Sequence, residues 1–447
     1  MPKKTDPQDI LDSLIRAARA AGADAADALV VESVSASVSY RLGKLEDVER
    51  AESADLGLRV FVGERVAFVS STDLTKDGLA ELPGRAVAMA KLAPEDKFAC
   101  LAPAELLAKQ FPNLDIEDAN EPSAERLIEL AKSVEGAAMA VPGITNSEGG
   151  GASFGRSGVA LATSTGFFGR YAATSHSIGV AVLAGEGTAM ERDYESVSAR
   201  HASDLENAEA VGKRAGERTI ARLNPKKAKS ASLPVIYDPR VSMGLVGSFA
   251  SAVSGASIAR GVSFLKDRMN QAVFAKGITI IDDPHRQRGL RSKPFDGEGV
   301  ANRRMAVVEN GVLKSWFLDC GSAKQLGLTT TGHAARGTGG PPSPSPTNLY
   351  MEAGSTSPES LMLDIKDGFY VTELMGFGVN AVTGDYSRGA TGFWIENGKL
   401  AYPVSGVTIA GNLKDMFLNL TPANDLVFRH GTNAPTLRVE GMTLAGA

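Results

Sequence analysis

The sequence predicts an α+β protein with an N-terminal α+β domain and a C-terminal β-rich domain. Before residue 228, helical and paired-strand patterns alternate, and one eight-residue pattern occurs twice; from residue 229 on, paired strands dominate. At roughly 100–200 residues per domain, a chain of 447 residues has room for two or three domains. We therefore expect domains at 1–228 and 229–447, with the first divided into two similar helix, strand-hairpin and helix units at 1–110 and 120–224.

The first unit opens with an amphipathic helix. Asp6 can cap this helix, Pro7 suits its first turn, and Gly22 can end it. Its apolar face is formed by Ile10, Leu11, Leu14, Ile15 and Ala18. In the next segment, 33–40, serine alternates with apolar residues, and this period of two predicts a strand with one polar face.

A hairpin and a second helix complete the first unit. The hairpin runs over 58–62 and 66–69 around a turn at Gly63-Glu64, and the helix covers 75–92. The hairpin contains the pattern Gly-x-x-Val-x-x-Gly-Glu at 57–64, and the same pattern returns at 179–186. We interpret the repeat as an internal duplication; chance similarity between two hairpins is the alternative.

The second unit follows the same order. A helix is expected from Pro122-Ser123 to Ala138, strands follow through 158–173, and the repeated hairpin precedes another helix. Ser203 and Glu206 have the spacing of a capping box for that last helix. The polar segment Asn224–Ser232, which begins with Asn-Pro, is the expected domain boundary.

The C-terminal domain is predicted to begin with a strand over 233–237 and a helix of small residues over 241–259, which is too polar to span a membrane. Two hairpins are predicted at 307–313 and 394–400. Each contains an Asn-Gly pair, which favours a tight turn because both residues tolerate positive φ. Paired strands over most of 278–428 indicate a curved sheet or a barrel-like domain. The Gly- and Pro-rich segment 337–347 is expected to be an exposed loop, either a lid or a plain connector.

Composition and charge limit the class of function. The net charge of −5 and the pI of 5.7 disfavour direct nucleic-acid binding, which usually needs a basic surface. Two distant cysteines, Cys100 and Cys320, form neither a disulfide framework nor a thiolate metal site. The N-terminal segment is basic but has no apolar run after it. We expect a cytoplasmic protein without a membrane segment.

The sequence carries no recognisable catalytic motif. None of the five histidines is followed by glutamate or lies within five residues of another, so no zinc-peptidase helix is visible. Cys320 follows Asp319 at an expected helix start, where a thiol becomes more reactive, but a cysteine is more commonly a small buried residue, and that is the interpretation we favour. The motifs of serine hydrolases, P-loops and dinucleotide sites are also missing from the sequence.

A glycine-rich cluster at 373–390 is the densest remaining feature. It places four candidate side chains, Glu373, Asp385, Tyr386 and Arg388, among strand-forming residues. Glycine in strands often marks a close approach of backbone to a ligand, another chain or a packed helix. Arg388 can hold a carboxylate with two hydrogen bonds. The alternative is a glycine-rich barrel turn with a solvated Asp–Arg pair.

This cluster resembles the signature of PmbA/TldE-type proteins in the TldD/PmbA family. The similarity runs through FYVTELMG at 369–376, NAVTGDYSRG at 380–389, GFWIENG at 392–398 and TIAGNLKDM at 408–416, and it extends over essentially the whole chain. The resemblance implies a subunit that pairs with a TldD-type zinc peptidase to degrade unfolded proteins or small peptides. The family also has an older name that came from genetics, modulator of DNA gyrase.

The chain departs from the TldD pattern at the ligand positions. TldD-type subunits have a His-Glu-x-x-x-His helix and a later cysteine, whereas the similar segments here read GSFASAVS at 247–254 and RGAT at 388–391. We therefore expect no catalytic residue, no metal and no cofactor in this chain, with zinc only in the partner subunit. The chain by itself should be inactive, and Glu373, Asp385, Tyr386 and Arg388 are candidate peptide-channel residues. A homodimer, a stand-alone hydrolase and a regulatory protein without a protease role are the alternatives.

Overall fold

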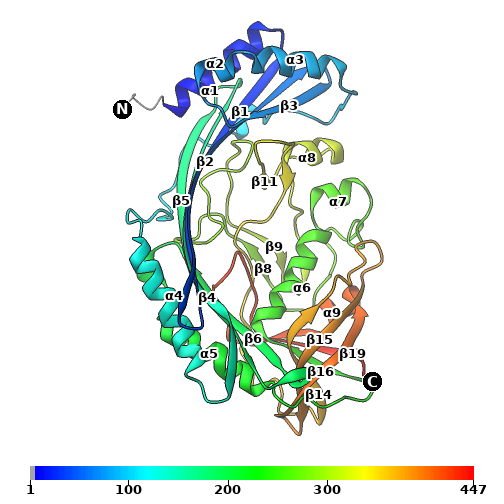
Figure 1. Ribbon diagram of the computed structural model, residues 1–447. Helices are drawn as coiled ribbons and strands as arrows, with labels where there is room; N and C mark the ends of the chain where they lie inside the picture. Colours follow the sequence, from blue (N-terminus) through cyan, green and yellow to red (C-terminus); the bar gives the residue numbers. More distant parts are fainter. Residues whose placement is uncertain (1–5, 447) are drawn as a thin grey trace.

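The N-terminal half of the chain forms one long antiparallel sheet (Figure 1). The computed structural model describes residues 6–446. Strand order in the sheet is β3-β2-β1-β4-β5-β6, and every neighbouring pair is antiparallel. The strands are β1 (Ala25–Arg41), β2 (Lys44–Val62), β3 (Arg65–Ser71), β4 (Ile144–Thr163), β5 (Phe168–Ala184) and β6 (Glu191–Ala199).

Two similar units meet at the centre of this sheet, as the sequence repeat predicted. β1 pairs with β4, so each unit contributes three consecutive strands to one half. The repeated pattern ends at equivalent hairpin turns, β2–β3 and β5–β6, where Gly63 and Gly185 have φ of 58° and 87°. The helices of the first unit are α1 (Pro7–Ala20), α2 (Lys76–Ala80) and α3 (Leu82–Leu92), and those of the second are α4 (Ala124–Met139) and α5 (Ala208–Ala221).

The helices cover one face of the sheet, and alternation along the strands decides which side chains lie beneath them. The alternating segment at 33–40 lies inside the longer strand β1, where Val38 is buried in the core under α4 and α5. The neighbouring serines point to the opposite face. That face, which we call the inner face, carries Leu29, and Leu29 packs against Phe295 and Val300 of the C-terminal half.

Two helix predictions need correction. The helix expected over 75–92 is two helices, because Pro83 has no N–H to continue the first one. The helix expected over 241–259 is α6 (Pro239–Ala252) and α7 (Gly255–Ala259). The break occurs because the N–H of Gly255 donates to the carbonyl of Phe317 instead of continuing the helix.

The capping prediction for α5 is also wrong. Ser203 lies in a short 3₁₀ turn, η3 (Ala202–Asp204), and the side chain of Asn207 caps α5 by accepting from the N–H of Ala210. The capping-box spacing does not mark the start of α5 because the chain makes an extra turn before the helix begins. Two further 3₁₀ turns are η1 (Ala104–Leu106) and η2 (Gly187–Ala189).

The C-terminal half contains a closed five-stranded barrel, which confirms the barrel-like prediction. Its strands follow one another in the order β16-β15-β14-β7-β19, and a pairing of β16 with β19 closes the circle. β17 (Leu420–Pro422) adds to β19. The barrel strands are β7 (Ala231–Tyr237), β14 (Asp367–Met375), β15 (Asp385–Glu396), β16 (Lys399–Asn412) and β19 (Leu437–Ala445).

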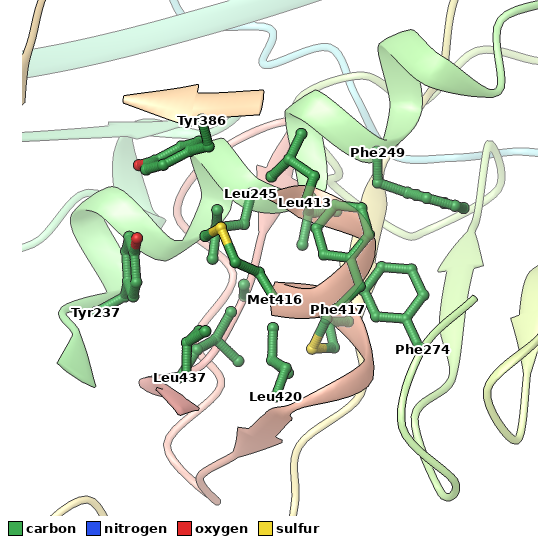
Figure 2. Close-up of a cluster of buried hydrophobic side chains, with 14 of the residues drawn as sticks. Tyr237, Leu245, Phe249, Phe274, Tyr386, Leu413, Met416, Phe417, Leu420 and Leu437 are labelled. Atoms are coloured by element: carbon green, nitrogen blue, oxygen red, sulfur yellow. The ribbon is translucent and has the colours of Figure 1, made fainter. Parts of the chain in front are cut away.

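The largest hydrophobic core joins the barrel to two helices. Leu245 and Phe249 of α6 pack with Met416 and Phe417 of α9 (Leu413–Leu418), and Tyr386 of β15 belongs to the same cluster (Figure 2). Phe274 stacks on Phe417 at a centroid distance of 4.4 Å. This core fixes where β15 and α6 lie relative to each other.

A second, small sheet lies beside the barrel in the order β10-β9-β8-β13-β18. Both Asn-Gly turns are confirmed, since Asn310 and Asn397 have φ near 50° and the following glycines are also left-handed. The segment expected as an exposed loop, 337–347, contains a two-residue strand, Ser343–Pro344, which pairs antiparallel with Ala334–Ala335. The remaining elements are β8 (Ile280–Asp282), β9 (Met305–Glu309), β10 (Val312–Leu313), α8 (Cys320–Leu326), β11 (Ala334–Ala335), β12 (Ser343–Pro344), β13 (Leu349–Met351) and β18 (Thr432–Asn433).

No helix within residues 6–446 combines the length and the apolar character that a bilayer crossing requires. The division of the chain at 228/229, and of its first part at 110/120, stays a prediction.

Candidate functional site

A buried ion cluster, here called the Asp27 clamp, joins the inner face of the sheet to the C-terminal half. Arg336 Nη1 lies 2.6 Å from Asp27 Oδ1, and Arg59 Nε donates a 3.0 Å hydrogen bond to Asp27 Oδ2. All three side chains are at most 4% exposed. Burial alone would raise the pKa of Asp27, but the charges of Arg336 and Arg59 outweigh it and hold that pKa below its ordinary value.

Glu298 extends the Asp27 clamp toward helix α8. Its Oε1 lies 3.8 Å from Arg59 Nη2, and its Oε2 accepts a 2.8 Å hydrogen bond from the N–H of Cys320. Burial, and then the nearby carboxylate of Asp296, raise the pKa of Glu298 to about 7. Burial and the adjacent Glu298 also raise the pKa of the Cys320 thiol. Cys320 is therefore a buried structural residue rather than an activated nucleophile.

A second ion cluster, the Asp193 clamp, joins β6 and α5 to the start of α6. Arg240 Nη1 lies 2.8 Å from Asp193 Oδ1, and Arg222 Nη1 lies 3.5 Å from Asp193 Oδ2. Burial opposes ionisation of Asp193, but its hydrogen bond to Arg240 and the charges of both arginines lower its pKa. Glu373 belongs here, because its Oε2 lies 2.7 Å from Arg222 Nη1.

The other three predicted channel residues lie on β15 in different environments. Asp385 is exposed and accepts from Thr383 Oγ1 and Asn412 Nδ2, and these hydrogen bonds lower its pKa. Arg388 Nε donates to the carbonyl of Met375 at 3.1 Å. Tyr386 is 3% exposed and lies in the barrel core (Figure 2).

The structure thus separates the four residues instead of gathering them around one cavity. Glu373 holds an arginine of a clamp, and Tyr386 contributes to the core. Only Asp385 and Arg388 keep polar atoms near the surface, and no ion pair between these two is found among the described residues. In this conformation the Tyr386 side chain is out of reach of an extended peptide.

From the last residue of β14 toward β15 the chain forms an exposed segment, 375–382, here called the apolar loop. Its side chains are unusually exposed: Phe377 is fully exposed, and Val382 and Met375 are 57% and 50% exposed. The backbone is nevertheless fixed, since the carbonyl of Gly378 accepts a 2.7 Å hydrogen bond from the N–H of Ser387. Exposed apolar patches of this kind often belong to a binding surface.

Helix α6, which the family resemblance aligns with a zinc-binding helix, does not fit a metal ion. Its sequence, PRVSMGLVGSFASA, has no histidine, cysteine, aspartate or glutamate. Within the described part of the chain, no three such side chains gather closely enough to hold a metal. Four histidines contact protein partners instead: His176 with Asp118, His201 with Asp115, His285 with Asn302 and His333 with Asp282.

A cleft of about 520 Å³ lies on the inner face of the sheet. Strands β1, β4 and β5 line one side with serines, and segments 291–293 and 345–346 of the C-terminal half line the other. Arg156, Arg200, Arg291 and Lys293 border it.

Sequence reasoning missed the clamps and this cleft. A signal for the Asp27 clamp was present, because Asp27 and Arg59 interrupt apolar strand patterns, where a charge needs a buried partner. The basic residues of the cleft come from distant segments and carry no local signal. The apolar loop could have been noticed as four apolar residues, at 375, 377, 379 and 382, between turn-forming glycines.

Family profiles match almost the whole chain. The three parts of the PmbA/TldA metallopeptidase architecture align in order: domain 1 over residues 26–90, the central domain over 117–223 and the C-terminal domain over 230–446. Metalloprotease PmbA of Escherichia coli O157:H7 is 39% identical over 95% of this chain and 92% of its own length. The PmbA homologue of Haemophilus influenzae is 36% identical over 97% of this chain and 94% of its own.

Solved structures agree in fold. A proposed modulator of DNA gyrase from Bacteroides thetaiotaomicron superposes with a TM-score of 0.91 at 28% identity, covering 99% of this chain and 100% of the other. TldE from Thermococcus kodakarensis superposes with a TM-score of 0.87, covering 97% and 99%. Because the sequence identity is only 21%, this second match shows similarity of fold alone. A TldD homologue from Buchnera aphidicola is 23% identical over 51% of each chain.

Proposed function

The chain belongs to the PmbA/TldD metallopeptidase family, and from this premise we propose that it is the PmbA/TldE-type subunit of a heteromeric metalloprotease. A TldD-type partner supplies the zinc site, and this chain supplies none of its ligands. The complex cleaves unfolded proteins or small peptides in the cytoplasm, where the two free cysteines remain reduced.

The composition of α6 is the observation that carries this proposal. A catalytic zinc ion needs imidazole, thiolate or carboxylate ligands on a rigid element. The exposed face of α6 offers Ser248 and Ser251, and both hydroxyls donate to carbonyls of their own helix at 2.9 and 3.1 Å. Because these hydroxyls are engaged and neutral, they are poor replacements for the ligands of a zinc peptidase.

The apolar loop supports the part of the proposal that concerns a partner. Phe377 has no cover within the described chain, and burial of such a side chain at a protein interface is favourable by about 2 kcal/mol. We assign the TldD-type subunit as the chain that covers it. Asp385 and Arg388, which lie next to this loop, are proposed to face the peptide channel that the two subunits enclose.

Metal content and peptidase activity test the proposal directly. The purified chain and the TldD-type protein of the same organism are assayed alone and mixed, with an unstructured peptide as substrate. We expect the chain alone to be metal-free and inactive, and the mixture to cleave. Stoichiometric zinc in the isolated chain, or cleavage by the chain alone that survives a chelator, would overturn the proposal.

A matched pair of variants separates partner binding from folding. Phe377→Ser removes the exposed ring from the apolar loop, and Leu92→Ser removes an 88% exposed apolar side chain at the far end of the N-terminal sheet. Only Phe377→Ser should reduce complex formation on size-exclusion chromatography. If the wild-type chain instead forms a homodimer that Phe377→Ser dissociates, a second copy of this chain occupies the loop.

A further inference from the structure

The cleft on the inner face has an unusual charge. Its border carries Arg156, Arg200, Arg291 and Lys293, and the described residues that line it include no aspartate or glutamate. The whole chain, by contrast, is acidic, with a net charge of −5. A concentration of cations at one concave place attracts anionic groups.

Arg200 has no carboxylate partner among the described residues. Its Nε and Nη1 donate to the carbonyls of Gly289 and Thr174 at 3.1 and 2.8 Å, and its Nη2 donates to the carbonyl of Leu290. These bonds fix the guanidinium in place, use three of its five donors and leave the positive charge unbalanced. Burial accordingly lowers the pKa of Arg200.

The other cations are balanced to different degrees. Arg156 Nη2 lies 2.7 Å from Glu117 Oε1, so its charge is already paired. Lys293 Nζ donates to the carbonyl of Ala334 at 3.0 Å; burial lowers its pKa, and Asp296 opposes that effect from outside the cleft. The side chain of Arg291 is exposed and forms no ion pair within residues 6–446. The unbalanced charge therefore lies on Arg200 and Arg291.

The remaining lining fits a carboxylate. Ser157 and Ser175 line the cleft, and their hydroxyls can donate hydrogen bonds to anion oxygens. The hydroxyl of Ser33 is instead hydrogen-bonded to that of Ser53, and the hydroxyl of Ser345 donates to the carbonyl of Pro346. A volume near 520 Å³ lies in the usual range of ligand sites, about 300–1,000 Å³. A fixed guanidinium with free donors is suited to holding a carboxylate through charge-assisted hydrogen bonds.

We propose that this cleft binds a carboxylate group of a peptide through Arg200 and Arg291. The inference rests on the proposed function for the identity of the ligand as a peptide. It adds a site that lies apart from the α6 helix and depends on neither a metal nor the partner subunit. The carboxylate is either the C-terminus of the peptide or an acidic side chain, since both present the same chemistry.

Binding is measured on the chain alone by fluorescence anisotropy at low salt. Three peptides carry the same neutral dye: an alanine-rich peptide with a free C-terminal carboxylate, its C-terminal amide, and an amide with one internal glutamate. We expect the free acid to bind at least tenfold more tightly than the plain amide. Tight binding of the glutamate peptide alone assigns the site to acidic side chains. Equal affinity for all three peptides would refute the proposal.

Two variants and a control locate the site. Arg291→Gln changes an exposed side chain, so the protein should remain folded, and it should weaken binding of the charged peptide about tenfold. Arg200→Gln should do the same, with folding checked by circular dichroism because Arg200 also holds three carbonyls. Arg303→Gln removes an exposed cation that does not line the cleft and should change the affinity less than twofold. An equal loss in all three variants would reduce the effect to general charge and defeat the proposal.

These measurements are independent of the proposed protease function. A mixture that fails to cleave peptides leaves the carboxylate binding of the chain unaffected. A chain that does not bind the carboxylate can still form an active complex with its partner.

Discussion

Removing the charge of Asp27 should strongly destabilise the protein. The Asp27 clamp is one of the places where the N-terminal sheet and the C-terminal half share a buried charge, with Asp27 0% exposed between Arg59 and Arg336. Asp27→Asn keeps the size of the side chain, so no cavity forms. The variant does leave two buried guanidinium groups without their carboxylate, and this uncompensated charge is the source of the cost.

The structure sets the size of the effect. Breaking a buried ion pair by removing one partner costs about 3–5 kcal/mol. Glu298 lies 3.8 Å from Arg59 and supplies part of the missing negative charge, so we expect a loss near the lower end, about 3 kcal/mol. Such a loss reduces the ratio of folded to unfolded protein by a factor of roughly 100 or more.

Urea titration followed by far-UV circular dichroism measures the loss. Asp55→Asn is the matched control, because Asp55 is a half-buried carboxylate on the inner-face side of β2 that forms no ion pair within the described residues. We expect the control to lie within about 0.5 kcal/mol of wild type. A loss below about 1 kcal/mol in Asp27→Asn would refute the view that this carboxylate holds the two halves together.

The dependence on pH gives an independent check of the same clamp. The folded pKa of Asp27 lies below the ordinary value of 3.8. Its contribution to stability is therefore complete above pH 3.8 and is lost as the pH falls through the lower, folded value. The difference in stability between wild type and Asp27→Asn should accordingly shrink in strong acid.

Three further perturbations have defined outcomes. Glu298→Gln should flatten the pH dependence of unfolding: because burial raises this pKa, wild-type stability declines by roughly 3 kcal/mol as the pH rises from 4.5 to about 7. Phe377→Ser should weaken the complex with a TldD-type subunit at least about tenfold in calorimetric titration, with no decrease in Tm. Gly57→Ala should cost about 1–3 kcal/mol in urea, since its new Cβ would lie 2.3 Å from the carbonyl oxygen of Thr338, and should make the 337–347 segment easier to proteolyse.

Each of these has an outcome that contradicts it. An unchanged pH profile in Glu298→Gln would show that another group titrates in that range. Normal complex formation by Phe377→Ser would remove the apolar loop from the interface. For the glycine, Gly84→Ala on α3, which has open space around its Cβ, is the control and should be neutral or slightly stabilising. Equal stability of both glycine variants would mean that the loop yields to the new methyl group.

Local patterns in the sequence determined the individual elements. Alternation of serine with apolar residues placed the strand at 33–40, and the two Asn-Gly pairs placed hairpin turns at 310–311 and 397–398, because left-handed backbone favours these residues. The repeated Gly-x-x-Val-x-x-Gly-Glu pattern predicted two similar units, and it ends at equivalent turns of the sheet. The family resemblance carried by residues 369–416 is confirmed by the family profiles.

Helix ends were less accessible to the sequence. The break between α6 and α7 depends on a hydrogen bond from Gly255 to Phe317, and the cap of α5 on an extra turn before Asn207. Both features depend on where another part of the chain lies. The same limit applies to Tyr386, whose glycine-rich neighbourhood indicated a binding surface while the barrel core buries the ring.

Only the tertiary structure decided which distant residues share an environment. Asp27 meets Arg336, and Glu373 meets Arg222, across the boundary between the two halves of the chain. Arg200 is oriented by the carbonyls of Gly289 and Leu290. These hydrogen bonds place its charge in a cleft that no local sequence pattern predicts. The physical reason is that periodicity and turn chemistry act over a few residues. Buried charge, by contrast, is stabilised by whichever partner the closed barrel and the curved sheet bring within hydrogen-bond distance.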